Sequence, residues 1–234
     1  SRGIITDRNG KPLVSNRSTY DLTFDAALLS PEDDSNEAIL RLVQLCQEEG
    51  VAWSDNLPIS RYVPYRYTVD QLDSQQKRRF LTYVKSLRPC GDALAQYLLR
   101  HPEAVSTPEP EPEEGAEVPE TLTPEERANR LLERLVPGDL TAELLVEAGI
   151  TPAKLMDLMR GELNIPEDYT LSQARMVLGV QYELSVRKLD NYEAYVLAED
   201  IGTPFISLLS DGNYAGAKVT LSSVREYETT YAAH

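Results

Sequence analysis

The pattern of hydrophobic and polar positions places extended segments at the two ends of the chain. Near the start, Ile4-Ile5 and Leu13-Val14 flank Asn9-Gly10, a pair that tolerates the positive φ angles of a tight hairpin turn. Residues 20–25 then alternate apolar and polar side chains, which is the period of a half-buried strand. We therefore expect a hairpin and a further strand before any helix.

Helical spacing replaces this alternation in the middle of the chain. From Glu37 onward apolar residues fall on one helical face, and Gly50 ends that helix. Pro89 and Gly91 are expected to stop the next helix, and two capping boxes, at 123–126 and 170–173, mark later helix starts. The predicted helices cover about 37–49, 69–87, 91–99, 124–136, 141–148, 151–161 and 171–188, with irregular structure over 53–68.

The C-terminal end is strand-like again. Residues 195–198 predict a strand, Thr203-Pro204 opens a short helix, and residues 217–222 alternate apolar and polar side chains. Strands at both ends with helices between them indicate an α+β fold. We expect a small sheet formed by the N- and C-terminal strands, with an inserted helical region.

Composition and charge exclude some classes of function. The 234 residues carry a formal net charge of −15, which argues against a nucleic-acid binder because such a protein needs a basic face. No apolar run is long enough to span a bilayer. A tract rich in proline and glutamate at 107–115 predicts an exposed, acidic insertion over about 103–122.

Cysteine and histidine give no sign of metal or cofactor chemistry. Cys46 and Cys90 are either one disulfide bridge in an exported protein or, more simply, two buried thiols. His101 and His234 have no further ligands at metal-binding spacing. We therefore expect no metal site and no cofactor.

Fragments of a penicillin-type serine active site are present but do not form a set. Ser74–Lys77 and Ser185–Lys188 both match S-x-x-K, and Ser54–Asn56 matches S-x-N, but it precedes both of them. No K-[TS]-G sequence occurs. These residues are expected to be polar groups on helix surfaces, so no catalytic residue is assigned.

The opening residues resemble a family motif. Residues 2–14, with the sequence RGIITDRNGKPLV, are similar to the R-G-x-I-x-D-R-N-G block that opens the extracytoplasmic part of class B penicillin-binding proteins. A second block, residues 214–219 followed by Arg225-Glu226-Tyr227 and Ala232–His234, is similar to the segment before the family's transpeptidase domain. Ala215 stands where the family usually has proline.

The resemblance implies that residues 1–234 are the non-catalytic pedestal, or dimerisation domain, of a peptidoglycan D,D-transpeptidase. An N-terminal helix would anchor the parent at the outer face of the cytoplasmic membrane, and the transpeptidase domain would follow residue 234. Implied partners are that domain, cell-wall synthesis proteins such as a glycosyltransferase, and a second copy in a homodimer. The motif residues are Arg2, Gly3, Asp7, Arg8, Asn9, Gly10, Arg225 and Tyr227.

Two points remain open at the level of sequence. Arg2 or Arg8 is expected to pair with Asp7 or with another acidic residue there, fixing the hairpin against the C-terminal strands. The tyrosine-rich segment 61–67 either covers a core edge or forms a binding surface. If the segment binds, the alternative function is a stand-alone exported module that binds glycan or protein. A second alternative is a small hydrolase with an unrecognised carboxylate pair.

Overall fold

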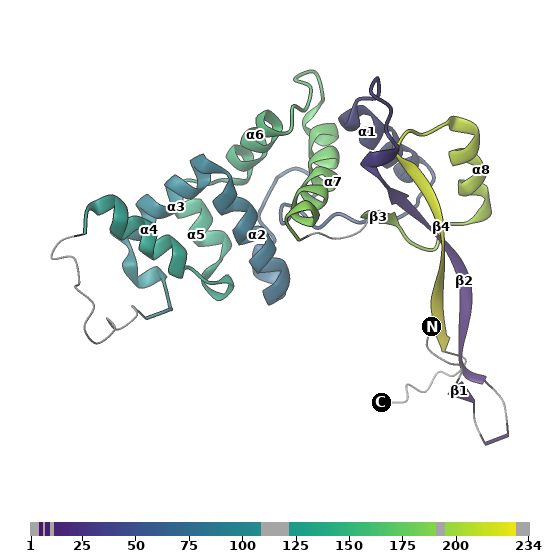
Figure 1. Cartoon of the computed structure of the whole chain (residues 1–234), viewed down its shortest axis with the longest axis horizontal. Helices are drawn as coiled ribbons and strands as arrows, with labels where there is room; N and C mark the ends of the chain where they lie inside the picture. The colour runs from purple at the N-terminus through teal and green to yellow at the C-terminus, as the bar shows by residue number, and fades with distance from the viewer. Residues whose placement is uncertain (1–4, 7, 10–11, 109–121, 191–194, 228–234) are drawn as a thin grey trace. The chain divides into compact units, whose positions relative to one another are not determined.

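The computed structural model describes residues 5–6, 8–9, 12–108, 122–190 and 195–227 (Figure 1). The chain divides into two compact units. The first unit joins residues 1–55 to residues 191–234, and the second consists of residues 56–190. The two ends of the sequence therefore fold together around an inserted helical unit, which confirms the predicted α+β class.

The secondary structure follows the predicted order. The strands are β1 (Ile5–Thr6), β2 (Pro12–Phe24), β3 (Tyr195–Ala198) and β4 (Ala217–Tyr227). The helices are α1 (Ser35–Glu48), α2 (Ser74–Ser86), α3 (Arg88–Arg100), α4 (Pro124–Arg134), α5 (Ala142–Glu147), α6 (Pro152–Glu162), α7 (Leu171–Asp190) and α8 (Thr203–Gly212).

Strand β2 is the centre of the first unit's sheet. Strand β4 pairs with it antiparallel in an unbroken register, from Val14 opposite Tyr227 to Phe24 opposite Ala217. Strands β1 and β3 pair with β2 at its two ends, and both lie on the edge that β4 leaves open. Between these two ends the sheet is a two-stranded ribbon, visible in Figure 1 as the long pair of arrows.

The core of the first unit lies at the β3 end of the ribbon. Leu22 and Phe24 of β2 are fully buried, together with apolar residues of α1, β3 and α8. Two backbone hydrogen bonds join loops to these strands: the Ser54 N–H donates to Leu197 O at 2.7 Å, and the Ile201 N–H donates to Tyr20 O at 2.7 Å.

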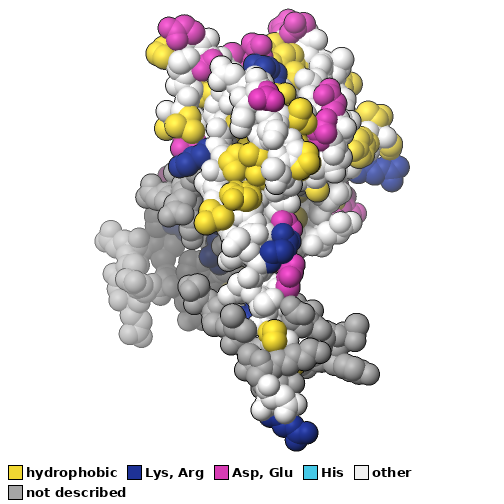
Figure 2. Space-filling model, turned by 90° about the vertical axis from the view of Figure 1, so that its right-hand side faces the viewer, with side chains coloured by type: hydrophobic (Ala, Val, Ile, Leu, Met, Phe, Trp, Pro, Cys, Tyr) yellow, Lys and Arg dark blue, Asp and Glu magenta, His cyan; other side chains and the backbone are white. Residues whose placement is uncertain are grey.

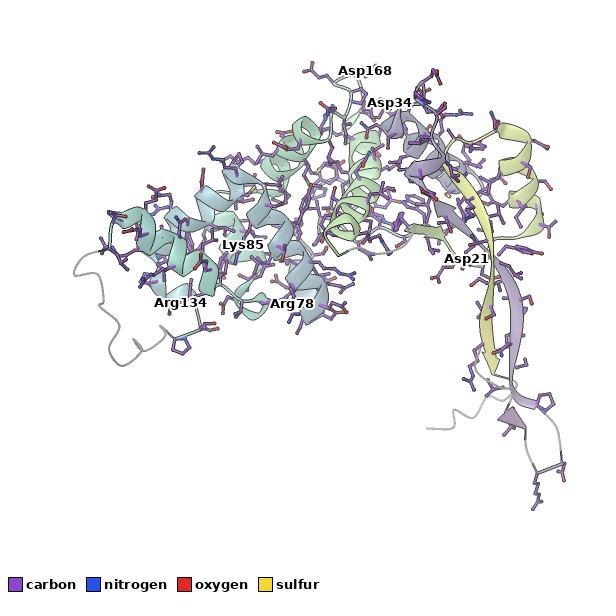
Figure 3. The ribbon with its side chains drawn as sticks, in the orientation of Figure 1. Asp21, Asp34, Arg78, Lys85, Arg134 and Asp168 are labelled. Carbon is purple, nitrogen blue, oxygen red and sulfur yellow. The ribbon has the colours of Figure 1, made fainter. Side chains whose placement is uncertain are left out.

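In the second unit, aromatic side chains pack between helices, and two lysines of α2 hydrogen-bond to the segment after α4. The Phe80 ring lies 6.1 Å from that of Tyr182 in an edge-on arrangement. Lys77 Nζ donates to Leu140 O at 3.0 Å, and Lys85 Nζ donates to Leu135 O at 3.2 Å, so α2 holds the segment that follows α4. Burial lowers the pKa of Lys85, which Figure 3 labels on α2.

Three sequence-based boundaries were wrong, each for a local reason. The helix predicted from residue 69 begins at Ser74, because the Asp73 carboxylate caps α2 by accepting two N–H groups at 2.8 Å. The third helix, predicted from residue 91, begins at Arg88, because Pro89 fits in its first turn, where a missing N–H costs nothing. The hairpin's second strand and the strand at 20–25 are one continuous β2.

The acidic insertion predicted over 103–122 lies largely outside the described residues. At its described start Val105 is buried, and the Arg134 Nε donates to Thr107 O at 3.2 Å. This edge of the stretch is therefore attached to the helical unit, and the exposed character of the remainder stays a prediction.

Candidate functional site

Three motif residues lie within the described part of the chain, two of them next to β2 and one on β4. Arg8 and Asn9 are exposed in the turn between β1 and β2, and Arg225 of β4 lies opposite Asn16 of β2. Arg2, Gly3, Asp7 and Gly10 and the side chain of Tyr227 lie outside the described residues, so the expected pairing of Asp7 with Arg2 or Arg8 stays a prediction.

An arginine that the sequence did not single out ties three segments together at this ribbon. Arg17 of β2 donates its Nε to Glu226 on β4 at 2.6 Å and its Nη2 to Asp200, which follows β3, also at 2.6 Å. Arg17 lowers the pKa of Asp200 through this hydrogen bond. All three side chains are exposed, so they orient the ribbon more than they stabilise it.

The face that carries β4 and α8 also exposes apolar side chains. Tyr20 of β2 and Leu221 of β4 are direct cross-strand partners, and Leu221 is 72% exposed. Figure 2 shows hydrophobic side chains gathered on this face, above a group of basic and acidic ones. Such a patch is a normal feature of a protein that contacts other surfaces, but here it does not define a pocket.

The tyrosine-rich segment forms a hydrogen-bonded loop in the second unit. Residues 60–66, here called the tip loop, are closed by a bridge between Ile59 and Tyr67. The Ser60 hydroxyl accepts the Arg66 N–H at 3.0 Å and lies 3.2 Å from the carbonyl oxygens of Tyr62 and Pro64. The loop is therefore organised around one hydroxyl group.

A buried arginine holds the base of the tip loop. Arg175 of α7 is 1% exposed, and its guanidinium donates to Ile59 O at 2.5 Å, to Ser60 O at 3.2 Å and to Leu57 O at 3.4 Å. One signal for this role is present in the sequence, because Arg175 is a basic residue on the apolar face of a predicted helix. The sequence does not indicate which carbonyl oxygens it would bind.

The segment 61–67 has one part that packs on the core and one part that is exposed, and binding by the exposed part stays a prediction. Tyr67 covers a core edge: its hydroxyl donates to Ile150 O at 2.8 Å, and its ring lies 6.4 Å from that of Phe80. Tyr62 and Val63, in contrast, are 65% and 73% exposed at the tip of the loop.

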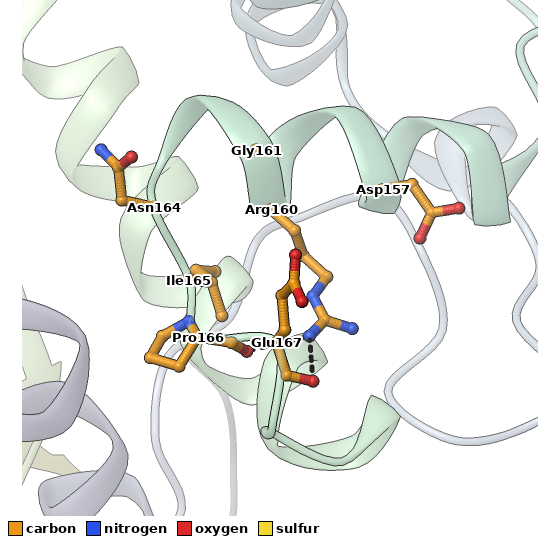
Figure 4. A pocket seen from close by; sticks show the side chains of 7 residues that line it. All are labelled: Asp157, Arg160, Gly161, Asn164, Ile165, Pro166 and Glu167. Atoms are coloured by element: carbon orange, nitrogen blue, oxygen red, sulfur yellow. Dashed lines mark hydrogen bonds between the residues drawn. The ribbon is translucent and has the colours of Figure 1, made fainter.

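A shallow pocket lies where α6 ends, here called the α6 pocket, with a volume of about 610 Å³. Arg160 donates its Nη2 to Pro166 O at 2.9 Å and to Glu167 O at 3.3 Å, which fixes the turn after the helix (Figure 4). The lining residues are Asp157, Arg160, Gly161, Asn164, Ile165, Pro166 and Glu167.

In the two S-x-x-K fragments, the lysine of the first and the serine of the second make local structural hydrogen bonds. Ser74 is the exposed first residue of α2, while the Lys77 ammonium donates to the Leu140 carbonyl. The Ser185 hydroxyl donates back to Gln181 O within α7 at 2.8 Å. Neither arrangement presents a serine activated by a lysine.

The remaining candidates are also accounted for locally. Cys46 and Cys90 are free, buried thiols, so the disulfide alternative was wrong. His101 ends α3, stacks on Tyr97 with the ring centres 4.6 Å apart, and lies 3.2 Å from Glu103. His234 lies outside the described residues.

Within the described residues, no group of three or more His, Cys, Asp or Glu side chains is placed to hold a metal ion. None of the helices in this part of the chain is long and apolar enough to cross a bilayer.

Comparison with known proteins identifies the family. The model of the penicillin-binding protein dimerisation domain matches residues 1–234. Among solved structures, the chain is similar to penicillin-binding protein 2B of Streptococcus pneumoniae (strain 5204), with 12% identity over 98% of this chain and a TM-score of 0.32, too low to carry an argument. The chain spans about a quarter of that protein, 26% of its length.

No curated protein matches the chain. The comparisons give no support to a stand-alone glycan-binding module or to a hydrolase. Because the family model covers the whole sequence, this chain belongs to the family of penicillin-binding protein dimerisation domains.

Proposed function

We propose that this chain is the non-catalytic pedestal of a bacterial peptidoglycan D,D-transpeptidase, which positions the catalytic domain outside the membrane. The observation that carries the proposal is the family match over residues 1–234. The strand register supports it, because Val14, near the start of the chain, lies beside Tyr227, near its end. Segments that precede and follow the domain would therefore meet at one end of the ribbon.

This arrangement suits a domain placed between a membrane anchor and an enzyme. The anchor would hold the protein at the outer face of the cytoplasmic membrane, and the transpeptidase would follow β4. Partners would include cell-wall synthesis proteins such as a membrane glycosyltransferase. The ribbon's polar residues 15–18 would remain in water along its length.

Covalent labelling with a fluorescent penicillin tests this function. The 234-residue chain should remain unlabelled, because Ser74 and Ser185 lack an activating base, whereas the longer protein that contains it should label. Prior incubation with unlabelled penicillin is the control for specific acylation. Labelling of the 234-residue chain itself, or of neither protein, would contradict the proposal.

A further inference from the structure

Strand β4 has one edge that no other described strand covers. It pairs with β2 alone, while β1 and β3 lie along the opposite edge of β2 (Figure 1). The Ile201 N–H donates to Tyr20 O from the β3 side, so the backbone groups of Tyr20 face away from β4. Leu221, the cross-strand partner of Tyr20, therefore directs its own N–H and C=O away from β2, because both partners of a non-hydrogen-bonded antiparallel pair face outward.

The unbroken register extends this alternation along β4. Every second residue faces the open edge in the same way, and these residues are Val219, Leu221, Ser223 and Arg225. Within the described part of the chain, no backbone hydrogen bond reaches their outward N–H and C=O groups. Such a row of donors and acceptors is a template for one more strand.

Strand β4 also lacks most of the devices that protect a sheet edge from other chains. Its sequence, AKVTLSSVREY, contains no proline and a single lysine, and its register with β2 has no bulge. At 11 residues it is about twice as long as a typical strand. Leu221, near its centre, is exposed beside Tyr20, so the open backbone is accompanied by an apolar surface.

The Arg225 side chain indicates the chemistry of a strand that would fit this edge. Its Nε is buried and has no hydrogen-bond partner among the described residues. A buried cationic donor needs an acceptor, and a carboxylate makes the strongest hydrogen bond to it. Arg225 lies four residues from Leu221, on the same face of the sheet, because side chains alternate along a strand.

We propose that an extended segment of another protein adds to β4 as a further strand of this sheet. Its backbone would pair with the outward groups of residues 219–225. On the face that carries Tyr20, it would place an apolar side chain beside Leu221 and a carboxylate, four residues along, beside Arg225. This inference goes beyond the pedestal role and rests on the strand register, so strand addition and penicillin labelling can fail separately.

Hydrogen exchange followed by NMR tests strand addition with the 234-residue chain and a synthetic peptide. The peptide is acetyl-Asp-Thr-Val-Thr-Val-Thr-Val-amide, in which a valine lies four residues from the aspartate. At about ten times its dissociation constant it should slow exchange of the Val219, Leu221, Ser223 and Arg225 amides about tenfold, because only free chains exchange. The amides between them already face β2, so their exchange should change little.

Matched variants separate backbone pairing from contact with the exposed face. Ser223→Pro removes an outward N–H and no hydrogen bond between β2 and β4, so it should weaken peptide binding about tenfold, whereas Ser223→Ala should not. Arg225→Gln should weaken binding of the aspartate peptide but hardly affect a peptide with asparagine in its place. Unchanged thermal melting of each variant would show that the sheet is intact.

The exchange pattern decides the outcome. Alternating protection that Ser223→Pro abolishes would support the proposal. No binding of the peptide at about 1 mM would overturn it, as would equal protection by a peptide with methylated backbone nitrogens, which cannot donate to the edge. Protection of the outward amides that grows with the concentration of the chain alone would assign the edge to a second copy and would also overturn it.

Discussion

Arg175 illustrates how one buried residue organises a loop from another part of the sequence. Its planar guanidinium offers several donors in a fixed geometry, so a single side chain serves the carbonyl oxygens of Leu57, Ile59 and Ser60. Lysine has one charged nitrogen and cannot reproduce this fork. The cost of removing the donor is the cost of leaving buried carbonyl oxygens without a partner.

We expect Arg175→Met to lower the free energy of unfolding by about 3 kcal/mol, because several buried acceptors lose their donor together. Arg175→Lys should recover only part of this loss. Urea denaturation followed by circular dichroism measures both values. A change below about 0.5 kcal/mol for Arg175→Met, the range of ordinary surface substitutions, would show that the loop does not depend on this side chain.

In the first unit, the packing depends in a similar way on one residue, Gly216. Its φ is +75°, a conformation that side chains with a Cβ rarely adopt, and a Cβ there would lie 2.5 Å from Cε2 of Phe24. Phe24 is fully buried, so its ring has no room to move away. Gly202 offers a contrast, since a Cβ there would make an ordinary 3.5 Å contact with Pro204.

At the scale of elements, polar caps decide where helices begin. In α4, Thr123 and Glu126 form a reciprocal capping box, with the Thr123 N–H donating to Glu126 Oε2 at 2.7 Å and its hydroxyl at 2.9 Å. The backbone bond, followed by the hydroxyl bond, lowers the pKa of Glu126 because both favour its charged form. This links the stability of the element to pH.

The sign follows from the lowered pKa of Glu126. A carboxyl whose pKa is lower in the folded state stabilises the fold above its unfolded pKa, about 4.3 for glutamate, and loses that contribution as the pH falls through its folded pKa. The melting temperature of Glu126→Gln should therefore lie below the wild type at pH 7 and approach it near pH 3. Glu125→Gln, which removes a charge from the same turn outside the capping box, is the control; a pH-independent gap would contradict the argument.

The sequence predicted those elements whose signals are local. The capping boxes at Thr123 and Thr170, the helices they open and the strand at Tyr195 are confirmed, because cap and period lie within a few residues. The continuous β2 was missed because residues 15–18 lie in a ribbon with water on both sides, which removes the apolar alternation.

The site was less predictable because its key contacts join distant residues. Arg17 meets Asp200 and Glu226 about two hundred positions away, and Arg175 meets carbonyl oxygens more than a hundred positions away. Backbone acceptors leave no trace in the sequence, so periodicity cannot reveal them. The family motif indicated the ribbon, whereas the tip loop needed the folded chain.

At the scale of the whole molecule, each compact unit contains one buried thiol. Cys46 belongs to the first unit and Cys90 to the second. Burial raises the pKa of Cys46 to about 12 and that of Cys90 to about 11, so little of either is thiolate near neutral pH. Each thiol therefore reports when its own unit opens.

We expect Gly216→Ala to accelerate labelling of Cys46 by a thiol reagent without changing Cys90, and Arg175→Met to do the reverse. The reason is that each substitution destabilises only the unit in which it lies. Mass spectrometry of peptides after timed labelling separates the two sites. Gly202→Ala serves as the control, and parallel acceleration of both thiols would mean that the units open as one.

The register of the ribbon also determines how it responds to force. Tension applied at residues 5 and 227 would act at the end where Val14 lies beside Tyr227. It would load the backbone hydrogen bonds between β2 and β4 one after another instead of together, so the strands would separate at low force. The hydrogen bonds at this end would break first and those near the buried Leu22 and Phe24 last, so the ribbon would lengthen under load while the core of its unit stayed closed.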